Sequence, residues 1–396
     1  MHDIKSSTLL LAVLVFSQCQ NPANQPDLNE NPFKVEFHID IEEEEMKYFD
    51  ASRKEAKEKS LLQESGKQYK KASFTYQGML YPVKLKLKGD MEDHWGGGSW
   101  SMRIKMPKGK SVLGLTSFSL QAPYTREYLN EWVFHKMLKE EGIMALDYRF
   151  VRVYLNGVDM ECYAMEQHFA DDIFATNKVD TTVVLRFNED EWTPVMLASV
   201  GPERSQAIYN NAMVEAHNKK KVFGDPKRKA EFEAGKKLLE EWREGKILTT
   251  EAFDVQKMAR FWAVSNILNA GHANCWNNRR FYYNAETKVL EPIGNDANPH
   301  DTVRHVFCNY PGLGLNCTSF FKDKEFTKAF LTELRRMVSK SYLDRFFESN
   351  EDTIKMMMPM LLIHLNTYQF DRELFYHNQK VLREKLPDWE KQFSIK

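Results

Sequence analysis

The sequence has almost no excess charge of either sign. Its 396 residues include 55 Lys or Arg and 56 Asp or Glu, which gives a formal net charge of -1 at pH 7. A strongly basic chain would suggest nucleic acid or an anionic surface as partner. This composition gives no reason to expect a nucleic-acid partner, and any basic patch must be local.

Cysteine is scarce and widely spaced. None of the five cysteines forms a CxxC pair, so the spacing excludes the common structural zinc motifs. Cys308 and Cys317 lie in a segment rich in Gly, Asn and Pro. They are either a disulfide pair in an oxidising compartment or two small buried side chains.

The apolar run near the N-terminus, Leu9 to Phe16, is too short to span a bilayer as a permanent helix. With Lys5 before it and Cys19 after it, residues 1–18 are typical of a secretory signal peptide. A cysteine in this place is similar to a bacterial lipobox, which implies cleavage before Cys19 and lipidation of its thiol. We therefore expect an extracytoplasmic lipoprotein of the bacterial outer membrane or cell surface, in contact with the membrane only through its lipid. A cleaved signal without lipidation is the alternative. The polar residues 19–32 predict a flexible tether.

No internal repeat is evident, and the chain changes character along its length. Alternating patterns predict strands at 34–40, 71–90, 99–106, 116–123 and 147–169, with tight turns at Gln77-Gly78 and Asn156-Gly157. Helical spacing predicts helices at 42–62, 126–142, 205–221, 226–246, 252–270 and from 324 to 386. We expect an α+β protein with a β-rich N-lobe (33–166) and a mostly helical C-lobe (167–396). This is the element order of a protein-kinase-like two-lobed fold.

The segment 277–296 has the pattern of a metal-binding hairpin. Asn277 and Asn278 precede one predicted strand, and Asp296 follows the next. Transfer of a phosphoryl group needs a cation on the phosphates, a carboxylate and an amide on Mg²⁺, and a group that orients the acceptor hydroxyl. In kinases the base lies five residues before the metal-binding Asn, and here that position is His272. A histidine can accept a hydroxyl proton near pH 7.

Several motifs in this order resemble the spore-coat CotH kinase family of atypical, secreted or surface-bound kinases. They are "WNNRRFYYNAETKVLEPIGNDAN", "VKLKLKGD", "SMRIK" and "NGVDMECYAMEQ", and the resemblance runs from about residue 34 to 310. It implies a kinase that transfers phosphate from ATP, with Mg²⁺ or Mn²⁺, to a hydroxyl of a protein or envelope component.

The resemblance also implies roles for individual residues. Asp296 matches the metal-binding aspartate, and Asn277 or Asn278 matches the metal-binding amide. Arg103 or Lys105 corresponds to the cation near the phosphates, with Lys88 as a further candidate. Glu131 suits the acid that pairs with this cation, and Glu166 lies near the expected nucleotide base. His272 and Asp296 are the implied catalytic residues.

Two departures from the family pattern leave a second function open. The chain has no aspartate between Asp254 and Asp296, where the family has one, and its "GNDAN" segment carries fewer carboxylates, for which Asp301 could substitute. The alternative is a catalytically weak pseudokinase that acts as a surface assembly or scaffold protein. The basic strand residues have an ordinary interpretation as the solvated face of a sheet, and Asp296 one as a turn residue. A third hypothesis, carbohydrate binding, follows from Trp95, Trp100, Trp192 and Trp276.

Overall fold

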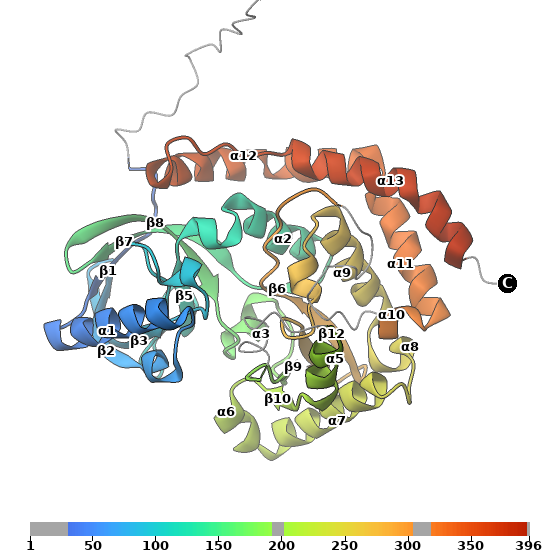
Figure 1. Cartoon of the computed structure of the whole chain (residues 1–396), viewed down its shortest axis with the longest axis horizontal. Helices are drawn as coiled ribbons and strands as arrows, with labels where there is room; N and C mark the ends of the chain where they lie inside the picture. The colour runs from blue at the N-terminus through green and yellow to red at the C-terminus, as the bar shows by residue number, and fades with distance from the viewer. Residues whose placement is uncertain (1–30, 192–201, 304–317, 394–396) are drawn as a thin grey trace, which may run out of the picture.

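The protein is described here from a computed structural model that covers residues 31–191, 202–303 and 318–393 (Figure 1). The predicted signal peptide, Cys19 and the tether up to residue 30 lie outside the described residues. So do Trp192, Cys308 and Cys317, so the alternative between a disulfide and two buried thiols falls outside them too. Cys162 and Cys275 are buried free thiols.

Seven strands of the N-terminal half close into a barrel (Figure 1). Around the barrel they are β1 (Glu36–Asp40), β2 (Lys70–Tyr76), β3 (Met79–Leu87), β4 (Met102–Lys105), β5 (Ser117–Gln121), β8 (Val158–Gln167) and β7 (Tyr148–Leu155). The predicted turns are present, because Gln77-Gly78 and Asn156-Gly157 both adopt positive φ at both residues, as two-residue hairpin turns require.

The barrel corrects the predicted kinase-like two-lobed fold, which is wrong. β1 pairs with β2 in antiparallel and with β7 in parallel orientation, and these two pairings close the sheet on itself. A closed seven-stranded barrel is not the sheet typical of a kinase N-lobe. Alternation in "KVEFHID" identifies a strand with Phe37 and Ile39 inside, but it carries no information on a partner more than a hundred residues away.

A second sheet of five strands lies in the C-terminal half, so this half is less purely helical than predicted. Its order is β10 (Val214–Ala216), β9 (Val184–Phe187), β11 (Arg280–Asn284), β12 (Val289–Gly294) and β6 (Met144–Ala145). The predicted hairpin is confirmed as β11–β12. The helix predicted at 205–221 is interrupted by β10, where Val214 and Ala216 are buried against β9.

Helices surround both sheets. The α-helices of the described residues are α1 (Glu43–Lys59), α2 (Leu129–Glu140), α3 (Asp172–Thr176), α5 (Pro202–Asn211), α6 (Lys219–Phe223), α7 (Pro226–Arg243), α8 (Thr249–Ala252), α9 (Val255–Ile267), α10 (Thr318–Phe321), α11 (Lys324–Met337), α12 (Lys340–His364) and α13 (Glu373–Phe393). The 3-10 turns are η2 (Glu64–Lys67), η3 (Glu92–His94), η4 (Pro123–Arg126) and η5 (Gly271–Asn274). Carboxylates of Asp225, Asp254 and Asp323 cap the N-termini of α7, α9 and α11.

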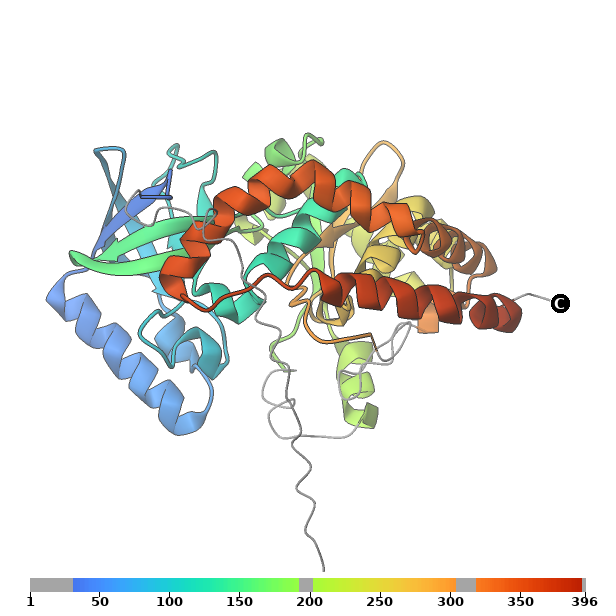
Figure 2. The same ribbon diagram turned by 90° about the horizontal axis from the view of Figure 1, so that it is seen from above.

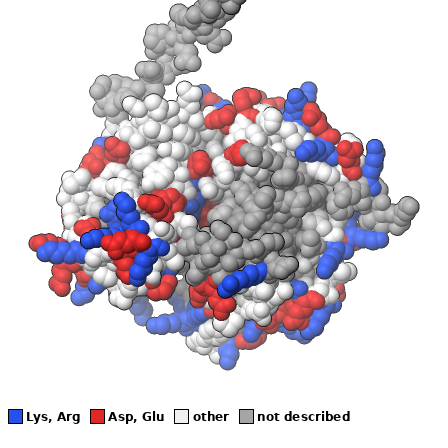
Figure 3. All heavy atoms as spheres, in the orientation of Figure 1, with Lys and Arg blue, Asp and Glu red and all other residues white. Residues whose placement is uncertain are grey.

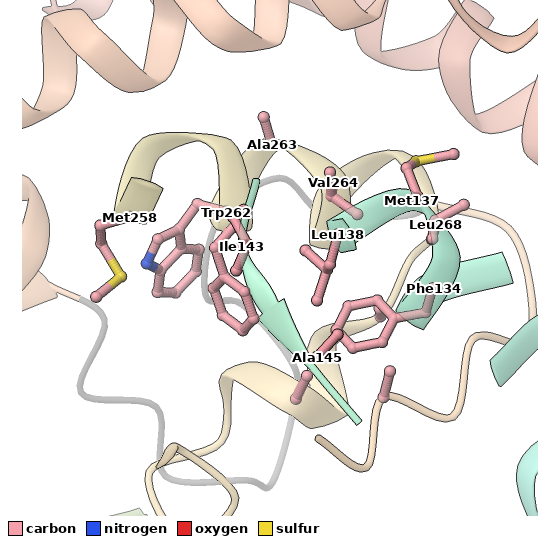
Figure 4. Packing of buried hydrophobic residues seen from close by; sticks show 14 of the residues in the cluster. Phe134, Met137, Leu138, Ile143, Ala145, Met258, Trp262, Ala263, Val264 and Leu268 are labelled. Carbon is pink, nitrogen blue, oxygen red and sulfur yellow. The ribbon is translucent and has the colours of Figure 1, made fainter. Parts of the chain in front are cut away.

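Helix α2 connects the two halves of the molecule. It follows the barrel strand β5 in the chain, but its apolar face packs in the core of the C-terminal half. Figure 4 shows Phe134 and Leu138 of α2 beside Ala145 of β6 and Val264 of α9. Figure 2 shows α12 and α13 running across the top of the molecule, and α12 packs on β7 and β8 of the barrel. The halves therefore share extensive buried contact.

The surface is mixed in charge. Figure 3 shows acidic and basic side chains next to one another over α1, where Lys47 pairs with Glu43 and Lys59 with Glu55. Among the helices that the structure describes, none combines the length and apolar character needed to cross a membrane.

Barrel closure predicts an unequal effect of two neighbouring substitutions in β1. The Phe37 ring is fully buried and lies 4.8 Å from Phe74 and 5.9 Å from Phe118, centroid to centroid. Phe37→Ala should lower the free energy of unfolding by about 3–5 kcal/mol, because it leaves a cavity between packed rings. The next side chain, His38, is exposed and stacks on Tyr154, so His38→Ala should cost about 1 kcal/mol or less. Urea unfolding of both variants measures the difference, and equal losses would contradict a closed barrel with Phe37 inside.

Candidate functional site

A cavity of about 540 Å³ lies where the barrel meets the second sheet. The residues that line it come from β3, β4 and β8 of the barrel, from β9 and β11 of the sheet, and from the segments around the hairpin. The lining includes most of the predicted site: Lys88, Arg103, Glu166, His272, Asn277, Asn278 and Asp296. The lining extends from Leu62 to Asn298, so segments more than two hundred residues apart in the sequence meet at one cavity.

The outer face of the barrel supplies one wall. Residues directly opposite each other on four adjacent strands form a row: Lys86, Arg103, Ser119 and Glu166. Alternation buries the leucines beside Lys86 and Lys88 in the barrel core, so the two lysines point outward. Here "outward" means into the cavity rather than into bulk water. The solvated-face interpretation of Arg103 and Lys88 is therefore wrong, whereas Lys105, at the end of β4, is exposed and outside the cavity lining.

Lys88 and Glu166 form a buried ion pair. The Lys88 Nζ atom lies 2.6 Å from Glu166 Oε2 and donates to Gln121 Oε1 at 2.5 Å. Burial lowers the pKa of Lys88, against the opposing effect of the Glu166 charge. Burial alone would raise the pKa of Glu166, but the charges of Lys88 and Arg126 outweigh it and hold that pKa low.

Asp296 is held between Arg126 and His272. Its Oδ1 atom lies 2.7 Å from Nε of Arg126, at the end of η4, and 3.5 Å from Nδ1 of His272. Burial would raise the pKa of Asp296, but Arg126 and His272 hold it well below its usual range. For His272 the burial effect is likewise outweighed, here by Asp296, so that its pKa lies above the ordinary value.

The hairpin amides lie beside this carboxylate. Asn278 donates through Nδ2 to the carbonyl of His272 at 3.0 Å, and His272 Nδ1 lies 2.8 Å from the carbonyl oxygen of Asp296. Since a carbonyl only accepts, Nδ1 carries the proton in this contact and Nε2 is the ring nitrogen that can accept one. Oδ1 of Asn277 and Oδ1 of Asn298 are buried without a hydrogen-bond partner among the described residues.

Glu131 is placed away from the cavity lining and holds the loop that carries Asp296. It is fully buried in α2, and its carboxylate accepts the backbone N–H of Ala297 at 3.0 Å and of Asn298 at 2.7 Å. Its neighbour is His135, 3.3 Å away, and the acid that pairs with a cavity lysine is Glu166 instead. Glu131 thus positions Asp296 through the backbone.

Sequence reasoning missed several cavity residues. Arg126 precedes α2 in a turn without any motif, and no site was predicted around Arg186, Glu189 or His217. Arg280 and Asn298 lie in or next to the predicted hairpin but were assigned no role. Arg126 carries no local signal, because its partner Asp296 is remote in sequence. Arg280 could have been predicted, because it belongs to the "NNRR" sequence that opens the hairpin and follows the two asparagines assigned to the site.

The donor set fits a divalent metal that arrives with a ligand rather than a resident metal. Among the described residues, no three His, Cys, Asp or Glu side chains group as metal ligands. One carboxylate, Asp296, and the unpartnered amide oxygens of Asn277 and Asn298 are nevertheless available. Mg²⁺ prefers oxygen ligands, keeps several waters, and is commonly bound by one or two carboxylates together with phosphates. The residues present fit that mode.

The tryptophans do not form a sugar platform. Trp95, Trp100 and Trp276 are buried in the hydrophobic interior, and the fourth candidate lies outside the described residues. A carbohydrate platform requires exposed rings, so the third hypothesis has no support from the described tryptophans.

Substitution of two glycines by alanine should lower the free energy of unfolding by clearly different amounts, because the backbone after Lys88 packs against a buried ring. A Cβ on Gly89 would lie 2.1 Å from the His94 ring, which is buried and 2.9 Å from Ser101 Oγ. Gly109 has a similar positive φ of 74°, against 86° at Gly89, but nothing within 4 Å of its Cβ position. Gly109→Ala should lower the free energy of unfolding by about 1–2 kcal/mol from backbone strain alone. Gly89→Ala should lower the free energy of unfolding by clearly more than this, because the buried His94 ring must also move. Thermal unfolding of the two variants side by side tests this prediction. Equal losses of stability would show that the His94 ring moves aside without a measurable cost in free energy.

Comparison with known proteins adds nothing to this geometry. No protein-family model matches the chain, and a search of curated proteins found no match either. The resemblance to the CotH family accordingly rests on the sequence motifs alone. Function has to be argued from the cavity, its charges and its hydrogen bonds.

Proposed function

We propose that the protein is a phosphotransferase that uses ATP with Mg²⁺ or Mn²⁺ and phosphorylates a hydroxyl of a protein or envelope component outside the cytoplasm. The proposal depends on one observation: Arg126, Lys88 and Asp296 line the same polar cavity. Arg126 contacts Asp296 directly, and the charge of Lys88 also lowers the pKa of Asp296. This combination provides cations for phosphates and a charged oxygen for a metal. The CotH-like motifs, including Asn277 and Asn278, support the same chemistry.

The cavity has the size and charge for such a ligand. Its volume of about 540 Å³ falls within the usual range of small-molecule sites, roughly 300–1,000 Å³. Seven Lys or Arg residues line it, against five Asp or Glu residues. Arg103 is suited to the phosphates, because its Nε atom donates to Ser119 Oγ at 2.8 Å and no carboxylate of the described residues lies within ion-pair distance of it.

The transfer would move one phosphoryl group. The bond from the γ-phosphorus to the bridging oxygen of ADP breaks, and a bond from that phosphorus to the acceptor oxygen forms. A bound Mg²⁺ would offset phosphate charge, held by Asp296 and by Asn277 or Asn298. His272 would accept the hydroxyl proton at Nε2, with Nδ1 fixed by the carbonyl of Asp296.

A binding protein without turnover is the second candidate. It is favoured by the contacts of Asp296, whose carboxylate is already engaged by Arg126 and His272. A protein of this kind would hold a nucleotide or another anion as part of a surface assembly. In either case we propose attachment to the membrane through the lipid on Cys19.

Nucleotide binding should distinguish two basic residues of β4. With millimolar Mg–ATP the melting temperature should rise by about 2–4 °C for each kcal/mol of binding free energy. Arg103→Met should reduce this rise, because Arg103 lines the cavity, whereas Lys105→Met should leave it unchanged. Asp296→Asn should remove the dependence on the metal. Differential scanning fluorimetry measures all four proteins, and the absence of any shift in the folded wild type would exclude the phosphotransferase.

Turnover should separate the two candidates. ADP formation in the presence of a detergent extract of cell envelope should fall about 10²–10⁴-fold in His272→Gln if His272 accepts the proton. The Mg–ATP thermal shift should persist in the same variant. A wild type that binds Mg–ATP but forms no ADP would support the binding protein, and unchanged turnover in His272→Gln would assign proton transfer to another group.

A further inference from the structure

Two arginines on neighbouring strands face the same end of the cavity. Arg186 of β9 and Arg280 of β11 are directly opposite each other in the antiparallel register, and both line the cavity. Like charges directly opposite on adjacent strands destabilise a sheet. Their juxtaposition beside a cavity therefore needs a compensating charge or a ligand.

The protein supplies only part of that charge. Glu189 is shared between the two: its Oε1 atom lies 3.1 Å from Arg186 Nη1 and 3.5 Å from Arg280 Nη2. Glu215 contacts Arg186 at 3.3 Å, but it also pairs with Lys219 at 2.6 Å. Counting these contacts, three basic groups share two carboxylates. Because Glu215 is shared with Lys219, which lies outside the cavity lining, Glu189 is, among the described residues, the one carboxylate of the lining in contact with both arginines.

The surroundings of the pair are suited to an anion rather than to a cation. His217 lines the cavity beside them, and its Nε2 atom is buried without a hydrogen-bond partner among the described residues. The His217 ring stacks on Phe169 at 4.5 Å, and Arg280 lies over the same phenyl ring at 5.8 Å. Burial, together with the charges of Arg280 and Arg186, holds the pKa of His217 well below its ordinary value. In the tautomer that carries its proton on Nε2, the neutral His217 ring donates one hydrogen bond, so that it and the two guanidinium groups can together donate several hydrogen bonds to one oxyanion.

We propose that Arg186, Arg280 and His217 form an acceptor subsite that binds an anionic group, a carboxylate or a phosphate, carried by the substrate near its reactive hydroxyl. This rests on the proposed phosphotransferase function, and it names the class of substrate as acidic. Lys88 and Arg126 belong to the donor end, where each is 2.7 Å or less from its own carboxylate partner. Arg186 and Arg280 would be left for the second, simultaneously bound anion.

Inorganic phosphate is the probe for this subsite. Titration by calorimetry, with the protein saturated by Mg²⁺ and a non-hydrolysable ATP analogue, should still show phosphate binding, because donor and acceptor must be bound together. Arg186→Gln should weaken that binding about tenfold through loss of a charge-assisted contact. Glu189→Gln should tighten it, since the competing carboxylate charge is lost. A role in folding alone would not produce opposite effects in the two variants. Lys220→Gln is the matched control, because Lys220 is an exposed lysine of α6 outside the cavity lining.

The possible results distinguish a failure of the acceptor subsite from a failure of the proposed phosphotransferase function. Phosphate that is displaced by the ATP analogue would place both arginines in the donor site and overturn the subsite while leaving the phosphotransferase intact. Phosphate binding that is indifferent to Arg186→Gln and Glu189→Gln would overturn it as well. Binding that requires the arginines in a protein without any Mg–ATP binding would retain an anion site and overturn its role as an acceptor site.

Discussion

The cavity depends on the buried contact between Arg126 and Asp296. Arg126 comes from the turn before α2, and Asp296 follows the last long strand of the second sheet, so the pair connects two structures that fold from distant parts of the chain. Removal of one member of a buried ion pair leaves an uncompensated charge, at a typical cost of about 3–5 kcal/mol. The pair keeps Asp296 ionised despite its burial. Without it, burial would raise the pKa of Asp296 against less opposition, and the ionised form that a metal needs would be less favoured.

The same pairing determines which ligands the cavity can accept. Lys88 is balanced by Glu166, and Arg126 by Asp296, so a bare polyphosphate would have to compete with two carboxylates for its cations. A polyphosphate that brings a divalent metal avoids this competition. Such a metal would be held by Asp296, and Arg126 would then be free for the phosphates of the proposed nucleotide. Under the proposed function, the charge arrangement would therefore suit a metal-bound nucleotide better than a bare polyphosphate.

Local patterns predicted the pieces of this site but not their arrangement. The hairpin 277–296, the Asn156-Gly157 turn and the outward lysines of β3 follow from residue order and alternation, which act over a few positions. Closure of the barrel depends on β1 meeting β7, and the position of Arg126 depends on a partner 170 residues away. The Arg186–Arg280 pair likewise exists only through strand register, because each arginine alone resembles an ordinary strand residue. Contacts between residues this far apart in the chain cannot be predicted from the residue pattern of either segment alone.

The loop after β12 shows why an acid in the hydrophobic core is needed to place another acid at the cavity. Asp296 and Asn298 adopt left-handed backbone conformations, with φ of 51° and 45°. Such conformations cost a non-glycine residue about 1–2 kcal/mol each, although Asp and Asn tolerate them better than most. The two hydrogen bonds from Ala297 and Asn298 to the buried carboxylate of Glu131 offset this cost, since bonds to a charged group contribute about 1.5–3 kcal/mol each. Glu131 therefore determines the direction of the Asp296 side chain without touching the cavity, and the motif "GNDAN" is functional only in a fold that presents this helix to it.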